Sequence, residues 1–242
     1  HRRKISHKQK SQNFQGIADR EEFKEAYKDV EDGFFAIFKQ NLNNKQYQRV
    51  GSCGLTAVIL KNSLHIANAG DCEGVLLSKN EAAMTNLRLN AGEHSAGKII
   101  KEFPGEPDIF ICKSACYVKG RLQPTRSLGD YYLKFKEYNF TKLRVFTGPY
   151  VSGEPLVTHF PLNDEHKNLV LATDGLWDEM DANKSTLTSA MEGTIWGKGC
   201  LTGYPDYTAT EFNQMFEELN KIRYRRDIHD DITLVNIRID DL

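Results

Sequence analysis

Apolar residues recur at three- and four-residue steps through residues 21–40, which predicts an amphipathic helix. Glu21, Glu22 and Glu25 lie in its first turn, where acidic side chains stabilise the helix dipole, and Asp19 is a plausible N-cap. The apolar stripe that should face the core consists of Phe23, Tyr27, Val30, Phe34 and Phe38.

The pattern then changes to short apolar runs rich in strand-forming residues. Residues 55–60 and 64–69 are separated by Lys61, Asn62 and Ser63, which predicts a β-hairpin. Residues 75–77 should continue this meander, followed by a turn at 78–80.

Further along the chain, residues 169–173 and 232–239 predict two more strands, and residues 212–222 predict a second amphipathic helix. Residues 143–157 contain several Gly and Pro residues, which indicates a loop or small subdomain over the sheet. Because strands and helices come in blocks and do not alternate strictly, we expect an α+β fold with largely antiparallel sheets.

Composition limits the class of protein. With 242 residues, 40% of them hydrophobic, the chain can form one or at most two domains with a sizeable core. No apolar run approaches the ~18 residues of a membrane span. A formal net charge of -1 argues against a protein that binds nucleic acid with its whole surface, and it leaves a local basic patch as an alternative. The basic stretch at residues 1–10 is interpreted as part of a solvated loop or frayed segment over 1–20, with a nucleic-acid arm or a transit peptide as alternatives.

The chain has five Cys residues and no Cys-x-x-Cys motif, so neither a disulfide framework nor a zinc ribbon is indicated. We interpret Cys112 and Cys116, four positions apart, as an ordinary reduced pair. A reducing intracellular compartment follows, the cytoplasm in the first place and the mitochondrial matrix as the alternative. The chain begins with His1 and its first Met is Met84, so we expect it to be incomplete at its N-terminus.

The candidate chemistry lies in Asp residues at predicted strand ends. Asp174 follows the strand at 169–173, while Asp230 and Asp231 precede the strand at 232–239. If these strands are antiparallel neighbours, their carboxylates converge at one sheet edge, and Asp71, after the strand at 64–69, can join them. Converging carboxylates repel one another, and a hard divalent cation, Mg²⁺ or Mn²⁺, removes that cost. The alternative is that an Asp before a Gly is a turn residue.

At these residues the sequence resembles the metal-dependent serine/threonine protein phosphatases of the protein phosphatase 2C family. The resemblance extends from about Glu21 to the C-terminus and suggests a domain over residues 21–242. Its segments occur in the family's order: Gly54–Val58 with Leu64–Asp71, Pro124–Asp130, Leu169–Asp178 and Asp230–Thr233. Two sequence segments, Pro124–Asp130 and Pro149–Pro155, are most similar to the pyruvate dehydrogenase phosphatase branch of this family.

This resemblance implies two packed, mainly antiparallel sheets flanked by helices, an αββα sandwich. It also implies hydrolysis of phosphoserine and phosphothreonine in phosphorylated protein substrates by a water activated at a binuclear Mg²⁺ or Mn²⁺ centre. By the same resemblance, Asp174 and Asp230 match ligands of the second metal, and Asp71 matches the ligand of a third, weaker ion. Residues 143–157 match the flap that shapes substrate choice. We expect a monomer that binds neither nucleic acid nor membrane.

The departures from the family's pattern leave two hypotheses. The Asp-Gly-His-Gly-Gly segment, which supplies the first metal site and a proposed general acid, is absent, and Asp32-Gly33 lies inside the predicted helix. No catalytic residue can therefore be assigned, and the sheet should lack its N-terminal strands. Cys72-Glu73 replaces Ser-Arg, and Asp231 replaces Asn. The chain is either part of an active phosphatase or a pseudophosphatase that serves as a binding or scaffold module.

Two residues near the motifs have structural interpretations. Trp177 is expected to pack in the core and not to serve as a substrate platform. Arg126 could be mistaken for a phosphate ligand, but the family's phosphate-binding Arg lies upstream of the matched segments. We therefore interpret Arg126 as a structural hydrogen-bond donor.

Overall fold

The computed structural model describes residues 20–60, 62–78, 82–91, 102–103, 106, 108–139, 143, 145–182 and 232–239. The basic segment at the start, the helix predicted at 212–222, and both Asp230 and Asp231 lie outside the described residues. The proposed boundary between a segment at 1–20 and a domain at 21–242 therefore stays a prediction.

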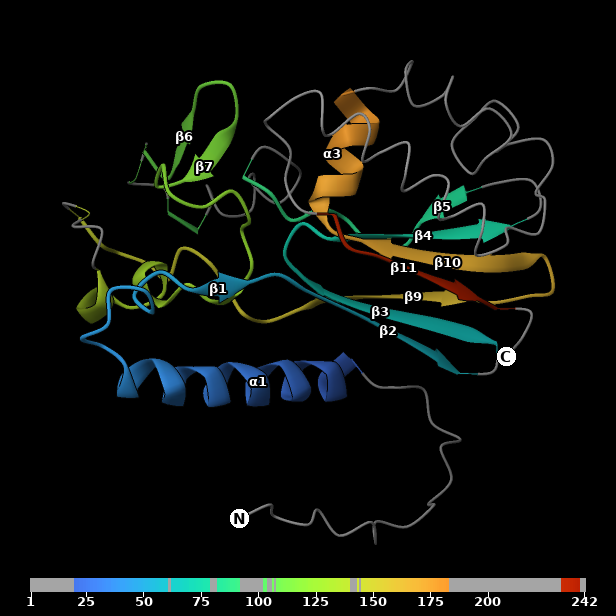
Figure 1. Cartoon of the computed structure of the whole chain (residues 1–242), viewed down its shortest axis with the longest axis horizontal. Coiled ribbons are helices and arrows are strands. Elements are labelled where there is room, and N and C mark those ends of the chain that lie inside the picture. Colours follow the sequence, from blue (N-terminus) through green and yellow to red (C-terminus); the bar gives the residue numbers. More distant parts are fainter. Residues whose placement is uncertain are drawn as a thin grey trace, which may run out of the picture.

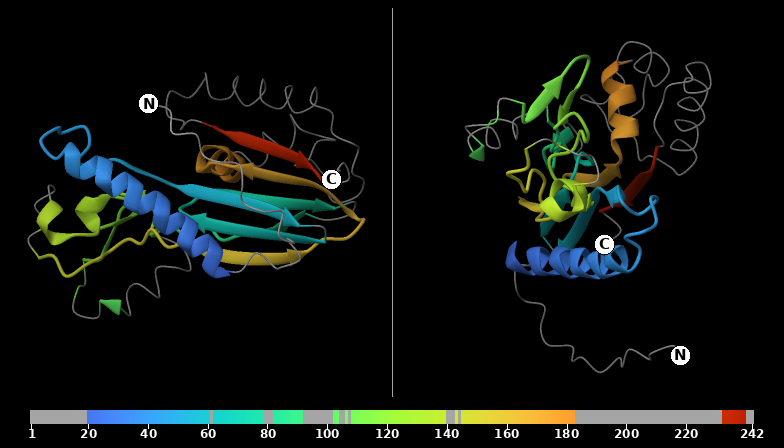
Figure 2. Two further views of the ribbon diagram at one scale, coloured as in Figure 1. Left: turned by 90° about the horizontal axis from the view of Figure 1, so that it is seen from below. Right: turned by 90° about the vertical axis from the view of Figure 1, so that its left-hand side faces the viewer.

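The described elements form four layers (Figure 1). Helix α1 (Arg20–Gln40) covers one sheet, a second sheet packs on the other face of the first, and helix α3 (Asp174–Ala182) lies beyond the second sheet. The right-hand view of Figure 2 shows the same order of layers. All pairings between named strands are antiparallel. The predicted αββα sandwich of the α+β class is confirmed.

The sheet next to α1 has the strand order β2-β3-β9. Its members are β2 (Gly54–Leu60), β3 (Ser63–Ala69) and β9 (Leu156–Pro161). β2 and β3 pair from Gly54 opposite Ala69 to Leu60 opposite Ser63, which confirms the predicted hairpin. Since β3 lies between α1 and the second sheet, it is buried on both faces.

The second sheet has the order β11-β10-β4-β5. Its members are β4 (Glu73–Ser78), β5 (Ala82–Met84), β10 (His166–Ala172) and β11 (Leu234–Arg238). The expectation that residues 75–77 continue the first meander is wrong, because β4 crosses to this sheet and pairs with β10. The loop from Gly70 to Cys72 makes the crossing.

The core between the sheets follows from strand alternation. Leu64 and Ile66 of β3 meet Leu76 of β4 and Leu169 of β10, and each of these side chains is at most 2% exposed. On its other face, β3 places Ala67 and Ala69 against Phe23 and Tyr27 of α1.

Helix α1 begins one residue before the predicted range and buries Phe23, Tyr27 and Phe38 as expected. The placement of Val30 in the buried stripe is wrong, since its side chain is 56% exposed. The neighbouring Glu31 faces the protein instead, because its carboxylate accepts hydrogen bonds from the Gly129 amide and the Lys134 ammonium. Aromatic contacts of Phe35 and Phe38 with Tyr131 complete this face of α1.

Beyond the sheets lies a smaller unit with its own apolar cluster. Its elements are β6 (Phe110–Cys112), β7 (Cys116–Val118), β1 (Gly51–Ser52), β8 (Leu128–Gly129) and the short 3-10 helices η1 (Tyr131–Leu133) and η2 (Lys136–Tyr138). The segment predicted as a loop at 143–157 has no regular structure among its described residues before β9 begins at Leu156.

The interpretation of Cys112 and Cys116 as a reduced pair is wrong. The β6–β7 hairpin places the two residues directly opposite each other, and their sulfur atoms form a disulfide. Sequence spacing alone did not reveal this because the pairing depends on the tight turn between the two short strands. The disulfide also weakens the argument from the cysteines for a reducing compartment.

A buried histidine, His65, lies beneath α1 and next to the exposed His159. His65 on β3 is 2% exposed, lies opposite His159 on β9 with ring centroids 4.8 Å apart, and stacks on Phe23 at 6.4 Å. The Nε2 atom of His65 is 3.1 Å from the Ser63 hydroxyl. Burial, and secondly the neighbouring His159, lower the pKa of His65. The folded protein therefore favours the neutral ring.

We expect the free energy of unfolding to fall as the pH drops below about 6.5, the pKa of histidine in an unfolded chain. A histidine with a lowered pKa contributes stability above that value, and acid removes it because the unfolded chain binds the proton more tightly. Urea unfolding of the wild type and of His65→Gln at several pH values measures the effect. The variant should lose part of the pH dependence, and an unchanged slope between pH 7 and pH 5 would contradict the prediction.

Among the described residues, no helix combines the length and apolar character needed to cross a membrane.

Candidate metal centre

The register of β4 against β10 brings two of the predicted ligands together. Glu73, the first residue of β4, lies opposite Ala172, the last residue of β10. Asp71, which comes just before β4, and Asp174, which comes just after β10, therefore lie at the same edge of the sheet. The Cys72 thiol between them is within electrostatic range of both carboxylates. The structure thus places Asp71 and Asp174 at one edge of the sheet, and their role as metal ligands stays a prediction.

Strand β11 reaches the same edge from the other side of β10. Leu234 lies opposite Ala172, and Thr173 and Thr233 continue the pairing beyond both strands. The Thr173 amide donates to the Thr233 carbonyl at 3.1 Å, and the Thr233 amide donates to the Thr173 hydroxyl at 3.1 Å. The predicted antiparallel neighbourhood of these strands is confirmed. Asp230 lies outside the described residues, but the described chain resumes at Ile232 beside this edge.

Two buried asparagines hold the loop that carries Asp71. Asn68 donates through Nδ2 to the carbonyls of Gly70 and Leu87, both at 3.0 Å. Asn86 accepts the amide of Gly74 at 2.8 Å and donates to the carbonyl of Cys72 at 2.9 Å. These bonds satisfy backbone groups that the crossing between the sheets leaves without strand partners.

Gly70 is required at the start of this loop. Its φ of +143° is a conformation that side chains rarely allow, and a Cβ there would lie 2.4 Å from the Cys53 sulfur. The missing side chain lets Cys53 pack directly against the loop.

Cys53, Cys72 and Asp71 form a small polar cluster. The Cys53 thiol donates to Oδ1 of Asp71 at 3.0 Å, and Cys72 directly follows Asp71 in the chain. The interaction with the Cys72 side chain, then burial and the charge of Asp71, raise the pKa of Cys53. The interaction with Cys53 lowers the pKa of Cys72, while burial and the charges of Asp71 and Asp174 act in the opposite direction. Asp71 itself is only 4% exposed.

Helix α3 begins at Asp174 and is fixed on the end of β10. Trp177 is 5% exposed and donates through Nε1 to the Ala172 carbonyl at 3.0 Å, which confirms its expected role in core packing. Asp178 forms an ion pair with Arg88, which lies between Leu87 and Leu89 of the loop over Gly70. Asp174 is thus held at a helix N-terminus, where a carboxylate is favoured.

The donor chemistry of this edge suits a hard divalent cation. A carboxylate that is almost fully buried, as at Asp71, needs a compensating positive charge or strong hydrogen bonds, and oxygen ligands select Mg²⁺ or Mn²⁺. Within the described part of the chain, no group of three or more His, Cys, Asp or Glu side chains is arranged to hold a metal. The described residues therefore provide two carboxylates, and the role of Asp230 stays a prediction.

A buried ion pair holds the Leu128–Asp130 segment against α1. Glu31 accepts the Gly129 amide at 2.8 Å through Oε2 and pairs through Oε1 with Lys134. Lys134 also donates to the Ser127 carbonyl at 2.7 Å, and burial lowers its pKa. Asp130 nearby is 4% exposed, and burial raises its pKa.

Arg126 lies at the start of the same segment. It donates to the carbonyl of Glu154, and a β-bridge joins Arg126 to Ser152. Burial lowers its pKa. These contacts confirm the expectation that Arg126 is a structural hydrogen-bond donor.

Sequence reasoning did not identify the residues that hold the carboxylates in place. Asn68 and Thr233 lie within the matched motifs, but the motifs give them no role. No pattern in the sequence indicates a role for Asn86 or Cys53. The side-chain pairing of Thr173 with Thr233 could have been suspected, because each lies at the end of a predicted strand. Asn86 carries no such signal, since it follows a short strand that the pattern does not predict.

Comparison with known proteins identifies the family to which this chain belongs. Residues 1–186 match the family model of protein phosphatase 2C, and the chain belongs to this family. Probable protein phosphatase 2C 46 of Arabidopsis thaliana is 33% identical over 237 residues, which cover 90% of this chain and 62% of that protein. Probable protein phosphatase 2C 72 of Oryza sativa subsp. japonica is 31% identical over 238 residues, covering 90% and 60%. The chain thus spans less than two thirds of these relatives.

Solved structures agree on the fold. A C. elegans sex determining protein superposes with a TM-score of 0.62 at 16% identity, covering 94% of this chain and 48% of that one. The serine-threonine phosphatase 2C of Toxoplasma gondii gives a TM-score of 0.55 at 16% identity, covering 90% and 66%. The resemblance to the pyruvate dehydrogenase phosphatase branch stays a prediction.

Proposed function

We propose that this chain forms part of a metal-dependent protein phosphatase that hydrolyses phosphoserine and phosphothreonine. The observation that carries the proposal is the register of β4, β10 and β11. It brings Asp71 and Asp174 to one sheet edge, beside the segment that leads back to Asp230. Family membership supports the same chemistry.

In this proposal Asp174 and Asp230 hold one Mg²⁺ or Mn²⁺ ion, and Asp71 holds a weaker one. The bound ions would supply an activated water and offset the charge of the phosphate. Helix α3 and the Thr173–Thr233 pairing fix the position of Asp174, while Asn68 and Asn86 fix the loop of Asp71. The chain's own contribution is thus to hold carboxylates at fixed separations that they would not adopt in a flexible loop.

The proposed substrates are phosphorylated proteins, and residues 143–157 would contact the region around the phosphorylated residue. The irregular backbone of the described residues before Leu156, next to the segment 127–130, supports a recognition role, since loops on a rigid scaffold commonly carry specificity. We further propose that the protein acts as a monomer inside the cell.

The proposal is tested by phosphate release from a phosphothreonine peptide with Mn²⁺, with Mg²⁺ and with a chelator. The assay compares the chain alone with the product of its complete coding sequence. We expect metal-dependent release from the complete product and little from this chain alone, because the chain has no Asp-Gly-His-Gly segment for a first metal.

The scaffold alternative predicts a different outcome. A folded complete product that binds phosphopeptide but releases no phosphate with either metal would overturn the phosphatase proposal. Release that is unaffected by the chelator would overturn its metal dependence.

A further inference from the structure

His65 and His159 form a cross-strand pair on the face of the first sheet that α1 covers. They lie directly opposite each other on β3 and β9, with ring centroids 4.8 Å apart and ring planes inclined by 55°. Phe23 of α1 stacks on His65 at 6.4 Å, so the pair lies beneath the first turns of that helix. Because His65 is 2% exposed and His159 is exposed, an ion can reach the pair from the side of His159.

Hydrogen bonds fix the tautomer of His65. The Ser63 hydroxyl donates its single hydrogen to the Leu60 carbonyl at 3.1 Å, so its oxygen accepts the Nε2–H of His65, also at 3.1 Å. Burial and the neighbouring His159 lower the pKa of His65, which favours the neutral ring. A neutral ring protonated at Nε2 carries its lone pair on Nδ1, where it can bind a metal. Metal-binding histidines commonly donate their other ring N–H to a fixed acceptor, and Ser63 is such an acceptor here.

From this geometry we propose that His65 and His159 together bind one divalent transition-metal ion such as Zn²⁺, Ni²⁺ or Cu²⁺. Metal–nitrogen bonds of about 2.0–2.1 Å and angles of about 90–110° place the centroids of two imidazoles on one ion roughly 4.5–5.2 Å apart. The two rings already have a centroid spacing within this range. Among the described residues, no third His, Cys, Asp or Glu joins the pair, so water would occupy the remaining positions on the ion.

The histidine site is distinct from the candidate metal edge in position and in ligand chemistry. His65 lies four residues before Ala69, the end of β3 nearest Asp71, which corresponds to roughly 13 Å along a strand. Imidazole nitrogen suits Zn²⁺, Ni²⁺ and Cu²⁺, whereas the carboxylate oxygens of the edge suit Mg²⁺ and Mn²⁺. The ion would join β3 to β9 and would stabilise the folded chain, because the two histidines are far apart in sequence and meet only on folding. The site therefore does not depend on phosphatase activity.

Calorimetric titration of the complete product with Zn²⁺, in a buffer with excess Mg²⁺ for the carboxylate edge, tests the site. The informative variant is His159→Gln, which removes one ligand at an exposed position and leaves the core intact. We expect the affinity of one Zn²⁺ site to fall at least 10-fold in this variant. In the wild type, Zn²⁺ at about 100 times its dissociation constant should raise the temperature of unfolding by roughly 5–10 °C, and the rise should be smaller in His159→Gln. Equal Zn²⁺ titrations of the two proteins would overturn the proposal.

The matched control is His166→Gln, the same change at the partly exposed first residue of β10, and its Zn²⁺ titration should equal that of the wild type. Modification of accessible imidazoles with diethyl pyrocarbonate locates the ion without a variant. Trypsin cleaves after Arg144 and Lys167, so one peptide, 145–167, contains both His159 and His166. Mass spectrometry of this peptide should show that Zn²⁺ slows modification of His159 and leaves that of His166 unchanged. Equal modification of His159 with and without Zn²⁺ would overturn the proposal, even if Zn²⁺ binds elsewhere.

Discussion

Replacement of Asp174 by asparagine is expected to lower metal-dependent phosphatase activity of the complete product by on the order of 100-fold. Asparagine keeps the shape of the side chain but removes the negative charge that binds the cation. Folding should be preserved, because asparagine is also favourable at a helix start. Initial rates over a range of Mn²⁺ concentrations, together with calorimetric Mn²⁺ binding, measure the effect.

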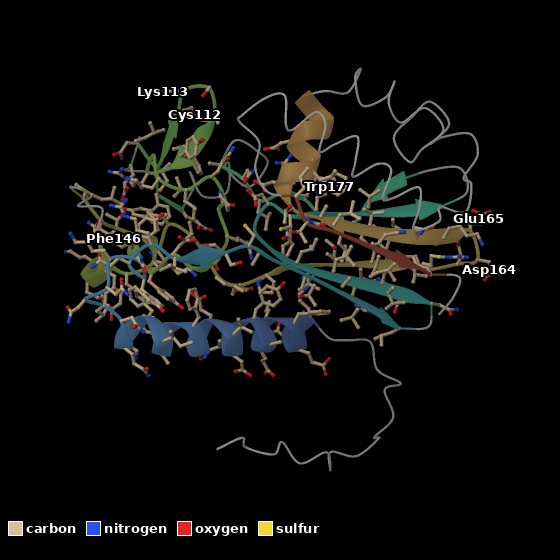
Figure 3. The ribbon with its side chains drawn as sticks, viewed as in Figure 1. Cys112, Lys113, Phe146, Asp164, Glu165 and Trp177 are labelled. Carbon is tan, nitrogen blue, oxygen red and sulfur yellow. A yellow bond between two sulfur atoms is a disulfide. The ribbon has the colours of Figure 1, made fainter. Side chains whose placement is uncertain are left out.

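The matched control is Asp164→Asn, the same chemical change on an exposed residue just before β10. Figure 3 shows Asp164 at the opposite end of the sheet from Trp177. Activity and Mn²⁺ affinity should stay unchanged in this variant, and its stability should change by less than about 0.5 kcal/mol. If Asp174→Asn and Asp164→Asn have the same Mn²⁺ titration, Asp174 is not a metal ligand.

Replacement of Glu31 by alanine is expected to have the largest effect on stability, a loss of about 3–5 kcal/mol. The substitution leaves the buried Lys134 ammonium without its ion-pair partner, since its side chain is 7% exposed and pairs with Glu31. It also removes the acceptor of the Gly129 amide. Thermal unfolding should shift down by roughly 10 °C for a chain of this size.

Two further variants distinguish this ion pair from a general effect of changing α1. Glu25→Ala, on the exposed face of the same helix, should change stability by less than about 0.5 kcal/mol. The double variant with Glu31→Leu and Lys134→Met removes both charges, so it should recover part of the stability lost in Glu31→Ala. Equal losses in Glu31→Ala and Glu25→Ala would show that the buried pair contributes nothing.

Hydrophobic periodicity predicted the parts of the fold that depend on local sequence. The helix at 20–40, the hairpin of β2 and β3, and strands β10 and β11 were each indicated by their own apolar pattern. Convergence of Asp71 with Asp174 was also predictable, because residues at the ends of antiparallel neighbours share an edge.

Tertiary contacts determined what the pattern could not predict. Helical periodicity places Val30 in the buried stripe and cannot predict that Glu31 faces inward. Glu31 does so because it pairs with Lys134, which is distant in sequence. The transfer of β4 to the second sheet depends on Gly70 and on bonds from Asn68 and Asn86, none of which alters the strand pattern. The disulfide between Cys112 and Cys116 likewise requires the hairpin that aligns them.

The central place of β10 in its sheet also governs when the candidate metal edge can form during synthesis. Leu169 pairs with Leu76 on one side and Ile237 on the other, so both partners are far from it in sequence. Contacts of this kind form slowly, since a long loop must close before they are gained. While β11 is still inside the ribosome, one edge of β10 has no strand partner and Thr173 cannot bind Thr233. The pairing that fixes Asp174 on this side of the edge therefore forms only after β11 has left the ribosome, and until then one edge of β10 can pair with other chains.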